Sequence, residues 1–285
     1  MKRHETEFPV DFMCEVFSVS RSGYYAWRSR DPSGVKVEKE NALLRKIEEI
    51  HLGSRSTYGS PRIFDVLQAT GHKVSKTKVE KMMKNNGIRS KVKRKFRVTT
   101  DSKHSLPVAP NLLKRNFSPE KPNQTWAGDV TYIWTREGWL FLAVVIDLFS
   151  RQVVGWSLEK TMTSDLVTSA LQTALTKRGP GVGLIFHSDR GSQYCSRSFR
   201  KQLRRHRMLQ SQSRKANCWD NACVESFFHT LKTEALYHED FKTREEARGF
   251  IFEWVEAFYN RTRIHSTLGY KSPVDFERNS FEIAA

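Results

Sequence analysis

The sequence predicts an α/β domain with a mixed sheet, preceded by an all-helical segment. In the first ninety residues the apolar positions follow helical spacing, and no segment alternates as a strand does. From residue 125 on, three strand-like runs follow one another, and later strands alternate with helices. The 285 residues are 38% hydrophobic, which is enough apolar material for one large core or two modest ones.

The charge balance predicts a polyanionic partner. Lys and Arg number 48 against 31 Asp and Glu, and the formal net charge is +17, so nucleic acid is the first candidate partner. No apolar run approaches the ~20 residues of a membrane-spanning helix. Charged residues and Pro9 interrupt the N-terminal stretch, where a secretory signal would be apolar. We therefore expect a cytoplasmic protein that does not bind a membrane.

The cysteines are expected to be free thiols. They are scattered along the chain, form no C-x-x-C pair and do not combine with histidines at zinc-finger spacing (Cys14, Cys195, Cys218 and Cys223). A structural zinc site is therefore not expected.

The N-terminal elements are all predicted to be helices. Residues 1–34 form a first segment, in which Ser20 or Ser22 caps a helix that begins near Gly23. Residues 35–90 are expected to form a helix-turn-helix-like DNA-binding module. Its helices are predicted over residues 37–52, from Ser60-Pro61 on, and over residues 75–86 with a stop at Gly87.

Basic residues gather at the end of this module. Between Lys73 and Arg97 there are eleven basic residues and one acidic residue, Glu80. We expect DNA contacts here, with the helix over residues 75–86 as a groove-reading helix; the residues are Lys76, Lys78, Lys81, Lys91, Lys93, Arg94 and Lys95. The alternative is a solvated basic face on a small helical bundle. Residues 197–215, with eight basic and no acidic residues, are a second candidate DNA surface.

The second half of the chain is predicted to be the α/β domain. A basic, Pro-containing linker over residues 91–120 leads into a core over residues 121–277 with a C-terminal helix, and residues 278–285 form a tail. Beyond residue 259 the chain is expected to be irregular and basic. Three sequential strands predict an antiparallel meander, over residues 125–134, 139–147 and 151–158. Further helices are predicted over residues 164–177, 197–206, 220–237 and 245–259, and further strands over 182–189 and 208–213.

Three carboxylates in this domain are candidate catalytic residues. Asp129 lies within the first strand, and Asp189 ends a later, buried-looking strand. That is where α/β folds place ligand-binding groups. Glu225 lies in the first turns of a helix, beside its apolar stripe, so it can reach over the end of the sheet. The spacing alone is weak evidence, because three of 31 acidic residues fit some spacing by chance.

Clustered carboxylates in a basic protein predict a metal site. They repel one another unless a cation lies among them, and hard oxygen ligands select Mg²⁺, or Mn²⁺, over zinc. Two ions about 3.5 to 4 Å apart could activate a water or a 3′-hydroxyl and stabilise the leaving oxygen of a phosphodiester. Cleavage or joining of a DNA strand is the reaction that this chemistry favours.

Several neighbours could assist these carboxylates. Lys232 and His229 lie on the same helical face as Glu225, so Lys232 could hold a DNA phosphate. A solvent-exposed Lys232 and a packing role for His229 are the alternatives. Arg190, directly after Asp189, is a further candidate DNA contact. His187 either lines the site or is a hydrogen-bonded structural histidine.

Separated motifs in the second half resemble the integrase core of insertion-sequence transposases. They are Trp126–Ile133, His187–Tyr194, Asp220–Ala222 with Glu225–Phe228 and Leu231-Lys232, and Tyr259-Asn260 with His265-Ser266 and Leu268–Tyr270. Tyr58-Gly59 with Arg62-Ile63 is similar to a helix-turn-helix segment of the insertion-sequence-three family. The chain is therefore identified as a member of that family, as its second-reading-frame product.

The resemblance implies a ribonuclease-H-like integrase core with a mixed five-stranded sheet and flanking helices. It also implies a DDE triad, which would be Asp129, Asp189 and Glu225, followed by Lys232. In that family Mg²⁺-dependent hydrolysis frees a 3′-OH at the element's end, and the 3′-OH then attacks another phosphodiester. The implied partners are DNA, further copies of the chain on DNA, and an upstream-frame protein or a frameshift fusion. The implied location is the bacterial cytosol at the nucleoid.

Two rival functions remain at the level of sequence. One is a DNA-binding repressor that occupies element ends without catalysis, against which the three carboxylates argue, because they are costly beside polyanionic DNA. The other is a metal nuclease that cuts without joining, which only product analysis distinguishes.

The basic run after the third predicted helix generates a prediction. Neutralising Lys91, Lys93, Arg94 and Lys95 together is expected to weaken binding to all DNA sequences and to reduce its salt dependence, because each phosphate contact releases counterions. Titrating labelled duplex DNA at several salt concentrations measures both effects. An unchanged salt slope would show that the run faces solvent.

Overall fold

The computed structural model describes residues 1–29, 35–91, 106–215 and 217–284. Lys93, Arg94 and Lys95, which were predicted to contact DNA, lie outside these residues. In the described part of the chain no helix is both long enough and apolar enough to cross a membrane.

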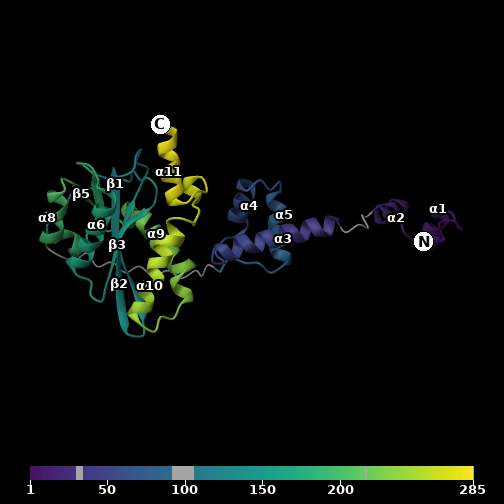
Figure 1. Cartoon of the computed structure of the whole chain (residues 1–285), viewed down its shortest axis with the longest axis horizontal. Coiled ribbons are helices and arrows are strands. Elements are labelled where there is room, and N and C mark those ends of the chain that lie inside the picture. Colours follow the sequence, from purple (N-terminus) through teal and green to yellow (C-terminus); the bar gives the residue numbers. More distant parts are fainter. Residues whose placement is uncertain (30–34, 92–105, 216, 285) are drawn as a thin grey trace.

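Short helices form the N-terminal segment, as predicted. They are the 3-10 turn η1 (Lys2–His4), α1 (Val10–Val16) and α2 (Arg21–Arg28). The Ser20 side chain accepts a hydrogen bond from the backbone N–H of Gly23, so Ser20 rather than Ser22 caps α2. Figure 1 shows this segment at one end of the chain, beyond α3.

The next three helices pack into a small module. They are α3 (Val35–Gly53), α4 (Ser60–Ala69) and α5 (Lys76–Asn85). Pro61 lies in the first turn of α4, and Ser75 caps α5 by accepting from the N–H of Lys78. A buried cluster holds the three helices together and consists of Ile47, Tyr58, Ile63, Leu67, Val79 and Met83. Ile264 from the C-terminal region packs against it, so the module contacts the core.

The core is built on a five-stranded sheet in the order β3-β2-β1-β4-β5. Its strands are β1 (Thr125–Thr135), β2 (Gly138–Asp147), β3 (Val153–Glu159), β4 (Ile185–Ser188) and β5 (Leu209–Gln212). β1, β2 and β3 pair antiparallel, whereas β1 with β4 and β4 with β5 pair parallel. The predicted meander and the mixed sheet are both confirmed.

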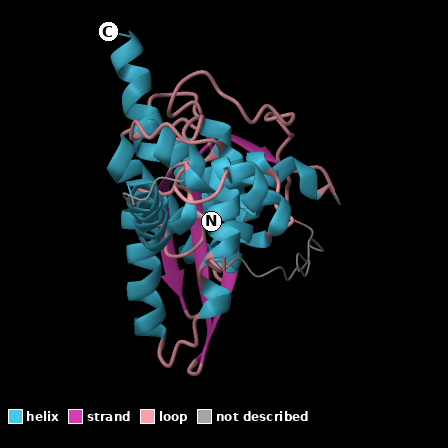
Figure 2. Ribbon diagram, turned by 90° about the vertical axis from the view of Figure 1, so that its right-hand side faces the viewer, coloured by secondary structure: helices cyan, strands magenta, loops and turns pink. Residues whose placement is uncertain are grey.

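Helices cover both faces of this sheet (Figures 1 and 2). One face packs on α6 (Ser164–Arg178) and α8 (Arg197–Arg205), with the short α7 (Ser192–Cys195) between β4 and α8. The other face packs on α9 (Ala222–Glu234), α10 (Arg244–Glu253) and the π-helical turn η4 (Trp254–Tyr259). Short 3-10 turns connect these elements: η2 (Cys218–Asn221), η3 (Leu236–His238) and η5 (Ser266–Leu268).

The expectation of an irregular chain beyond residue 259 is wrong for residues 273–284, because they form α11 (Pro273–Ala284). Ser272 accepts a hydrogen bond from the N–H of Asp275, and Pro273 begins the helix, which is the same start signal as at α4. Arg178 pairs with the buried carboxylate of Glu277, to which Ser150 also donates. These contacts fix α11 to the core.

The segment before the core also packs on it. Leu113 is buried in the core, and the backbone N–H groups of Leu112 and Leu113 donate to Ser211 Oγ. Residues 106–120, the described end of the predicted linker, therefore include chain that is held against β5.

Gly155 in β3 tests the packing of the sheet on α6. A Cβ atom at this position would lie 2.3 Å from the carbonyl oxygen of Ala170 and 2.6 Å from the backbone N of Ala174. Gly155→Ala is expected to lower the free energy of unfolding by about 1–3 kcal/mol, because backbone must shift to admit the methyl group. Urea titration measures this change. Gly181→Ala is the matched control, since no atom lies within 4 Å of its added Cβ, and equal stabilities of the two variants would contradict the packing argument.

Candidate active site

The register of β1 against β4 brings two of the predicted carboxylates together. Gly128 is paired with Ser188, so Asp129 and Asp189 each stand one residue beyond the same parallel pair, and adjacent strands lie only ~4.8 Å apart. β4 ends at Ser188, whereas β1 continues to Thr135. Asp129 therefore lies where β1 loses its β4 neighbour.

Helix α9 brings Glu225 to the same side of the sheet. Its residues Val224, Phe227 and Leu231 pack in one cluster with Ala127 and Ile133 of β1, which point to the same face as Asp129. Glu225 lies in the first turn of α9 beside Val224, and its side chain is exposed.

The electrostatics agree with this proximity. Burial raises the pKa of Asp129 well above its usual value, and the charges of Asp189 and Glu225 raise it further; the backbone N–H of Val130, which donates to Asp129 Oδ1 at 2.8 Å, opposes this. Burial and then Asp189 raise the pKa of Glu225. The three carboxylates thus repel one another across one site.

Lys232, which was predicted to lie on the Glu225 face, is half-buried beside this cluster. Its Nζ lies 4.9 Å from the centre of the Tyr132 ring. Burial lowers the pKa of Lys232, and Tyr132 and Asp129 oppose that change. An ammonium group at this point is suited to binding a phosphate group beside the carboxylates.

The other candidate side chains have different surroundings. His187 is fully buried and hydrogen-bonds Ser211 Oγ at 2.8 Å and Ser213 Oγ at 3.3 Å, which favours its structural reading, and burial lowers its pKa to about 4. His229 is exposed on α9. Arg190 Nε donates to the carbonyl oxygen of Ser213 at 2.7 Å, so this guanidinium ties the end of β4 to the segment after β5.

Apart from Lys232, the described lysines that were predicted to bind DNA belong to the helical module or follow it directly. Lys76, Lys78 and Lys81 are exposed on α5, and Lys78 Nζ lies 3.7 Å from the carboxylate of Glu40. Lys91 is half-buried, and its backbone N–H donates to Ser56.

Sequence reasoning missed Tyr194. This side chain of α7 is 2% exposed, and its hydroxyl oxygen would lie 3.3 Å from a Cβ placed on Gly128. Burial raises its pKa well above 10.0, and the charges of Asp129 and Asp189 raise it further. Its position five residues after Asp189 gave no periodic signal.

A buried charge network fixes the start of α9. Asp220 in η2 is fully buried and accepts from Arg115 Nε at 3.0 Å, Arg214 Nη2 at 2.9 Å and Asn111 Nδ2 at 2.9 Å. Hydrogen bonds from Arg214 are the main reason that the pKa of Asp220 lies well below its usual range. Asp220 thereby anchors the turn that places Glu225.

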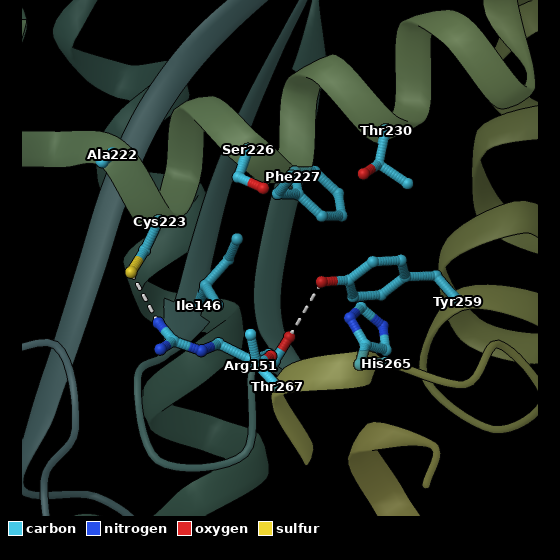
Figure 3. A pocket seen from close by; sticks show the side chains of 10 residues that line it. All are labelled: Ile146, Arg151, Ala222, Cys223, Ser226, Phe227, Thr230, Tyr259, His265 and Thr267. Atoms are coloured by element: carbon cyan, nitrogen blue, oxygen red, sulfur yellow. Dashed lines mark hydrogen bonds between the residues drawn. The ribbon is translucent and has the colours of Figure 1, made fainter. Parts of the chain in front are cut away.

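A separate pocket of about 190 Å³ is lined by residues of α9 other than Glu225 and Lys232 (Figure 3). Cys223, Ser226 and Thr230 of α9 line it, together with Arg151 and Tyr259. Arg151 donates to Cys223 Sγ, and Tyr259 donates to the Arg151 carbonyl oxygen at 3.2 Å. None of the three carboxylates lines this pocket.

Comparison with known proteins identifies the family. An HTH-like domain matches residues 38–96, and two integrase core domain models match residues 119–218 and 225–281. Transposase InsF for insertion sequence IS3A of Escherichia coli (strain K12) is 43% identical over 284 residues, covering 98% of this chain and 98% of InsF. The chain belongs to the IS3 family of transposases. The family assignment made from the sequence motifs is therefore confirmed.

The chain is also similar to two further proteins. An insertion element IS600 uncharacterized 31 kDa protein of Shigella sonnei is 46% identical over 273 residues, covering 96% of this chain and 100% of that protein. A structure of the HTLV-2 integrase catalytic core domain in complex with magnesium is 20% identical, covers 55% of this chain and 98% of that chain, and has a TM-score of 0.42. With its five-stranded mixed sheet and its matching integrase core models, this transposase has the expected ribonuclease-H-like integrase core.

The Asp220 network generates a prediction on stability and pH. Asp220→Asn is expected to lower the free energy of unfolding at pH 7 by about 2 kcal/mol, because charge-assisted hydrogen bonds to a fully buried group are lost. Because the pKa of Asp220 is lower in the folded chain than in the unfolded chain, its ionisation stabilises the fold above the unfolded-state pKa of ~3.9. This stabilisation is lost as the pH falls towards the pKa of the folded state. The difference in the free energy of unfolding between wild type and Asp220→Asn should therefore become smaller below about pH 4. Urea titrations at pH 7 and at pH 3.5 measure it, and a gap that is constant with pH would contradict the ionic role.

Proposed function

We propose that this chain performs metal-dependent DNA strand cleavage and 3′-OH strand transfer at the ends of an insertion sequence, with Asp129, Asp189 and Glu225 as a DDE triad. The observation that carries the proposal is the register of β1 and β4, which places Asp129 beside Asp189 on the face that α9 covers. The family is that of insertion-sequence transposases, and the triad gives its integrase core a catalytic centre.

The donor set fits Mg²⁺ or Mn²⁺. Three carboxylates offer hard oxygen ligands and no thiolate or imidazole, which is the chemistry these ions select. In the described residues no three His, Cys, Asp or Glu side chains form a group that could hold a metal ion as they stand. Ligation therefore requires side chains to turn, and exposed Glu225 in the first turn of α9 has room to do so. Two bound ions would activate the nucleophile and stabilise the leaving oxygen.

The chain's own residues position the DNA strand. The Lys232 ammonium, held between Asp129 and the Tyr132 ring, is placed to bind a phosphate oxygen beside the scissile phosphodiester. In the first step water attacks phosphorus, and the bond to the 3′-oxygen of the element breaks. In the second step that 3′-oxygen attacks a target phosphorus and displaces the target's own 3′-oxygen. Asp129, within β1, and Asp189, directly after β4, serve both steps from the rigid sheet.

The helical module is proposed to supply DNA affinity. Exposed Lys76 and Lys81 on α5 lie on a helix of the HTH-like domain, as a groove-reading helix requires. We propose that residues 35–90 bind the element ends, that residues 121–277 catalyse, and that several copies assemble on DNA with or without an upstream-frame protein or fusion. The bacterial nucleoid is the place where such a substrate is found.

Strand transfer tests the proposal. A labelled, pre-cleaved duplex of the element's end is incubated with plasmid target and Mg²⁺, and joined product is measured for wild type and for Asp189→Asn. The variant is expected to abolish joining while its DNA affinity stays within about threefold, because the phosphate contacts that dominate affinity remain. Asp165→Asn, an exposed aspartate in the first turn of α6, is the matched control and should join normally.

The same assay separates the rival functions. Joining by Asp189→Asn would remove Asp189 from the site. DNA binding without joining by wild type, both alone and fused to the upstream frame, would favour a repressor. Cleaved but never joined DNA would favour a nuclease.

A further inference from the structure

Three aromatic rings line one face of the β1–β2 hairpin near its tip. Trp134 lies directly opposite Trp139, and Tyr132 lies diagonally across from Trp139 on the same face. Trp134 is 58% exposed and Trp139 is 45% exposed. Figure 2 shows this hairpin extending past the helices that cover the rest of the sheet. A contiguous exposed apolar surface such as that of Trp134 and Trp139 is typical of an interaction site.

The rings form a continuous row on the face of β1 opposite to Asp129, and Lys232 connects this row to the candidate active site around the edge of β1 that β4 leaves open. Lys232 Nζ lies 4.9 Å from the centre of the Tyr132 ring, which lies 5.0 Å from that of Trp139, and the Trp139 ring lies 4.8 Å from that of Trp134. Lys232 also lies close enough to Asp129 for the two charges to interact. The exposed aromatic surface is thus continuous with the place where the scissile phosphate would bind.

The length of the row matches a few nucleotides. Asp129 and Trp134 are five residues apart on one strand, a distance of ~17 Å at ~3.3 Å per residue. Successive nucleotides of one DNA strand are ~3.4 Å apart along the helix axis. The rings from Tyr132 to Trp134 therefore lie about three to five nucleotides from a phosphate held at Asp129.

The chemistry of the tip favours bases over phosphates. Its charges are balanced, because Arg136 pairs with Asp240, and the guanidinium of Arg244, whose Nε donates to the Trp139 carbonyl oxygen at 3.1 Å, offsets the charge of Glu137. Exposed rings stack on any base, but only on a base whose face is free, since in a duplex neighbouring base pairs cover both faces. The partner that fits is therefore DNA with unpaired bases.

The patch is too small for a stable protein interface. A fully buried aromatic side chain contributes 150–250 Å², so three partly exposed rings offer on the order of 300 Å². A standard interface needs about 800 Å² from each partner. A second copy of the chain is thus the less suitable occupant.

We propose that Tyr132, Trp139 and Trp134 form a stacking platform that holds unpaired bases of the element's end, about three to five nucleotides from the reacting 3′-OH. This inference rests on the proposed strand-transfer function and names the state of its substrate: a DNA end whose terminal base pairs are opened. The platform holds the opened strand so that its phosphate stays beside Lys232.

The test combines photo-cross-linking with strand transfer, using the full chain. Pre-cleaved element ends carry 5-iododeoxyuridine either four or ten nucleotides from the 3′-OH, and ultraviolet light links the iodinated base to a ring stacked on it. Wild type should cross-link through Trp134 or Trp139 with iodine at the fourth position and not at the tenth. Trp134→Leu/Trp139→Leu keeps apolar bulk and removes the two exposed rings, and it should lose the cross-link at residues 134 and 139 and join DNA at least about fivefold more slowly.

Matched variants separate stacking from folding. Trp134→Phe/Trp139→Phe keeps the rings and should retain the cross-link and joining within about twofold. Phe252→Leu removes a ring that is 59% exposed on α10, packed beside Trp156, and should leave both readouts unchanged. Thermal unfolding midpoints check that all three variants are folded.

The outcomes are distinguishable from failure of the proposed function. If the Leu variant cross-links and joins like wild type while joining still depends on Asp189, the platform is wrong and the transposase reaction stands. If the Leu variant differs from wild type only in sedimentation, the patch binds a second copy and the platform is again wrong. A cross-link that is lost together with joining in the Leu variant alone supports the platform.

Discussion

The parallel pairing of β1 with β4 is the constraint on which the proposed catalytic site depends. It aligns Gly128 with Ser188 and so puts two aspartates at one level of the sheet. Gly128 is required there, because a Cβ atom would lie 2.7 Å from the Phe186 ring. A larger residue would push β1 away from the β4 side chains and separate Asp129 from Asp189. The early end of β4 then leaves Asp129 open on one side, which gives DNA an approach.

Buried charges position the elements around that pair. Asp220, with Arg115 and Arg214, fixes the turn before α9. At the other end of α9, Glu234 is 6% exposed and forms a bidentate pair with Arg263, both at 2.7 Å. Removing one partner of such a pair strongly lowers the free energy of unfolding, because the remaining charge stays buried without its counter-charge. They define the position of α9 more sharply than its apolar face does.

Sequence patterns predicted the elements better than the contacts between them. The antiparallel meander, the later strands and the capped helices follow from periodicity and from Ser, Pro and Gly signals. Ser272-Pro273 is the same helix-start signal as Ser60-Pro61, but the basic residues nearby favoured an irregular tail. The contacts of Glu277 that hold α11 were not predictable, because they join positions about 100 residues apart. The sequence placed Asp129 within a strand and Asp189 at the end of another. Tyr194 and the Lys232 contact with Tyr132 could not, because they depend on how α7 and α9 cross the sheet.

The position of Glu234 has a mechanical consequence. Arg62 of α4 reaches this carboxylate at 3.3 Å, and Tyr58 accepts a hydrogen bond from the N–H of Ile264, so the helical module is joined to the C-terminal end of α9. Glu225 stands near the other end of the same helix, about 14 Å away at ~1.5 Å per residue. A helix this short moves as a rigid rod. A force on the module would therefore be transmitted along α9 to Glu225, so the proposed binding of the element by the module and the position of the proposed third carboxylate are mechanically coupled.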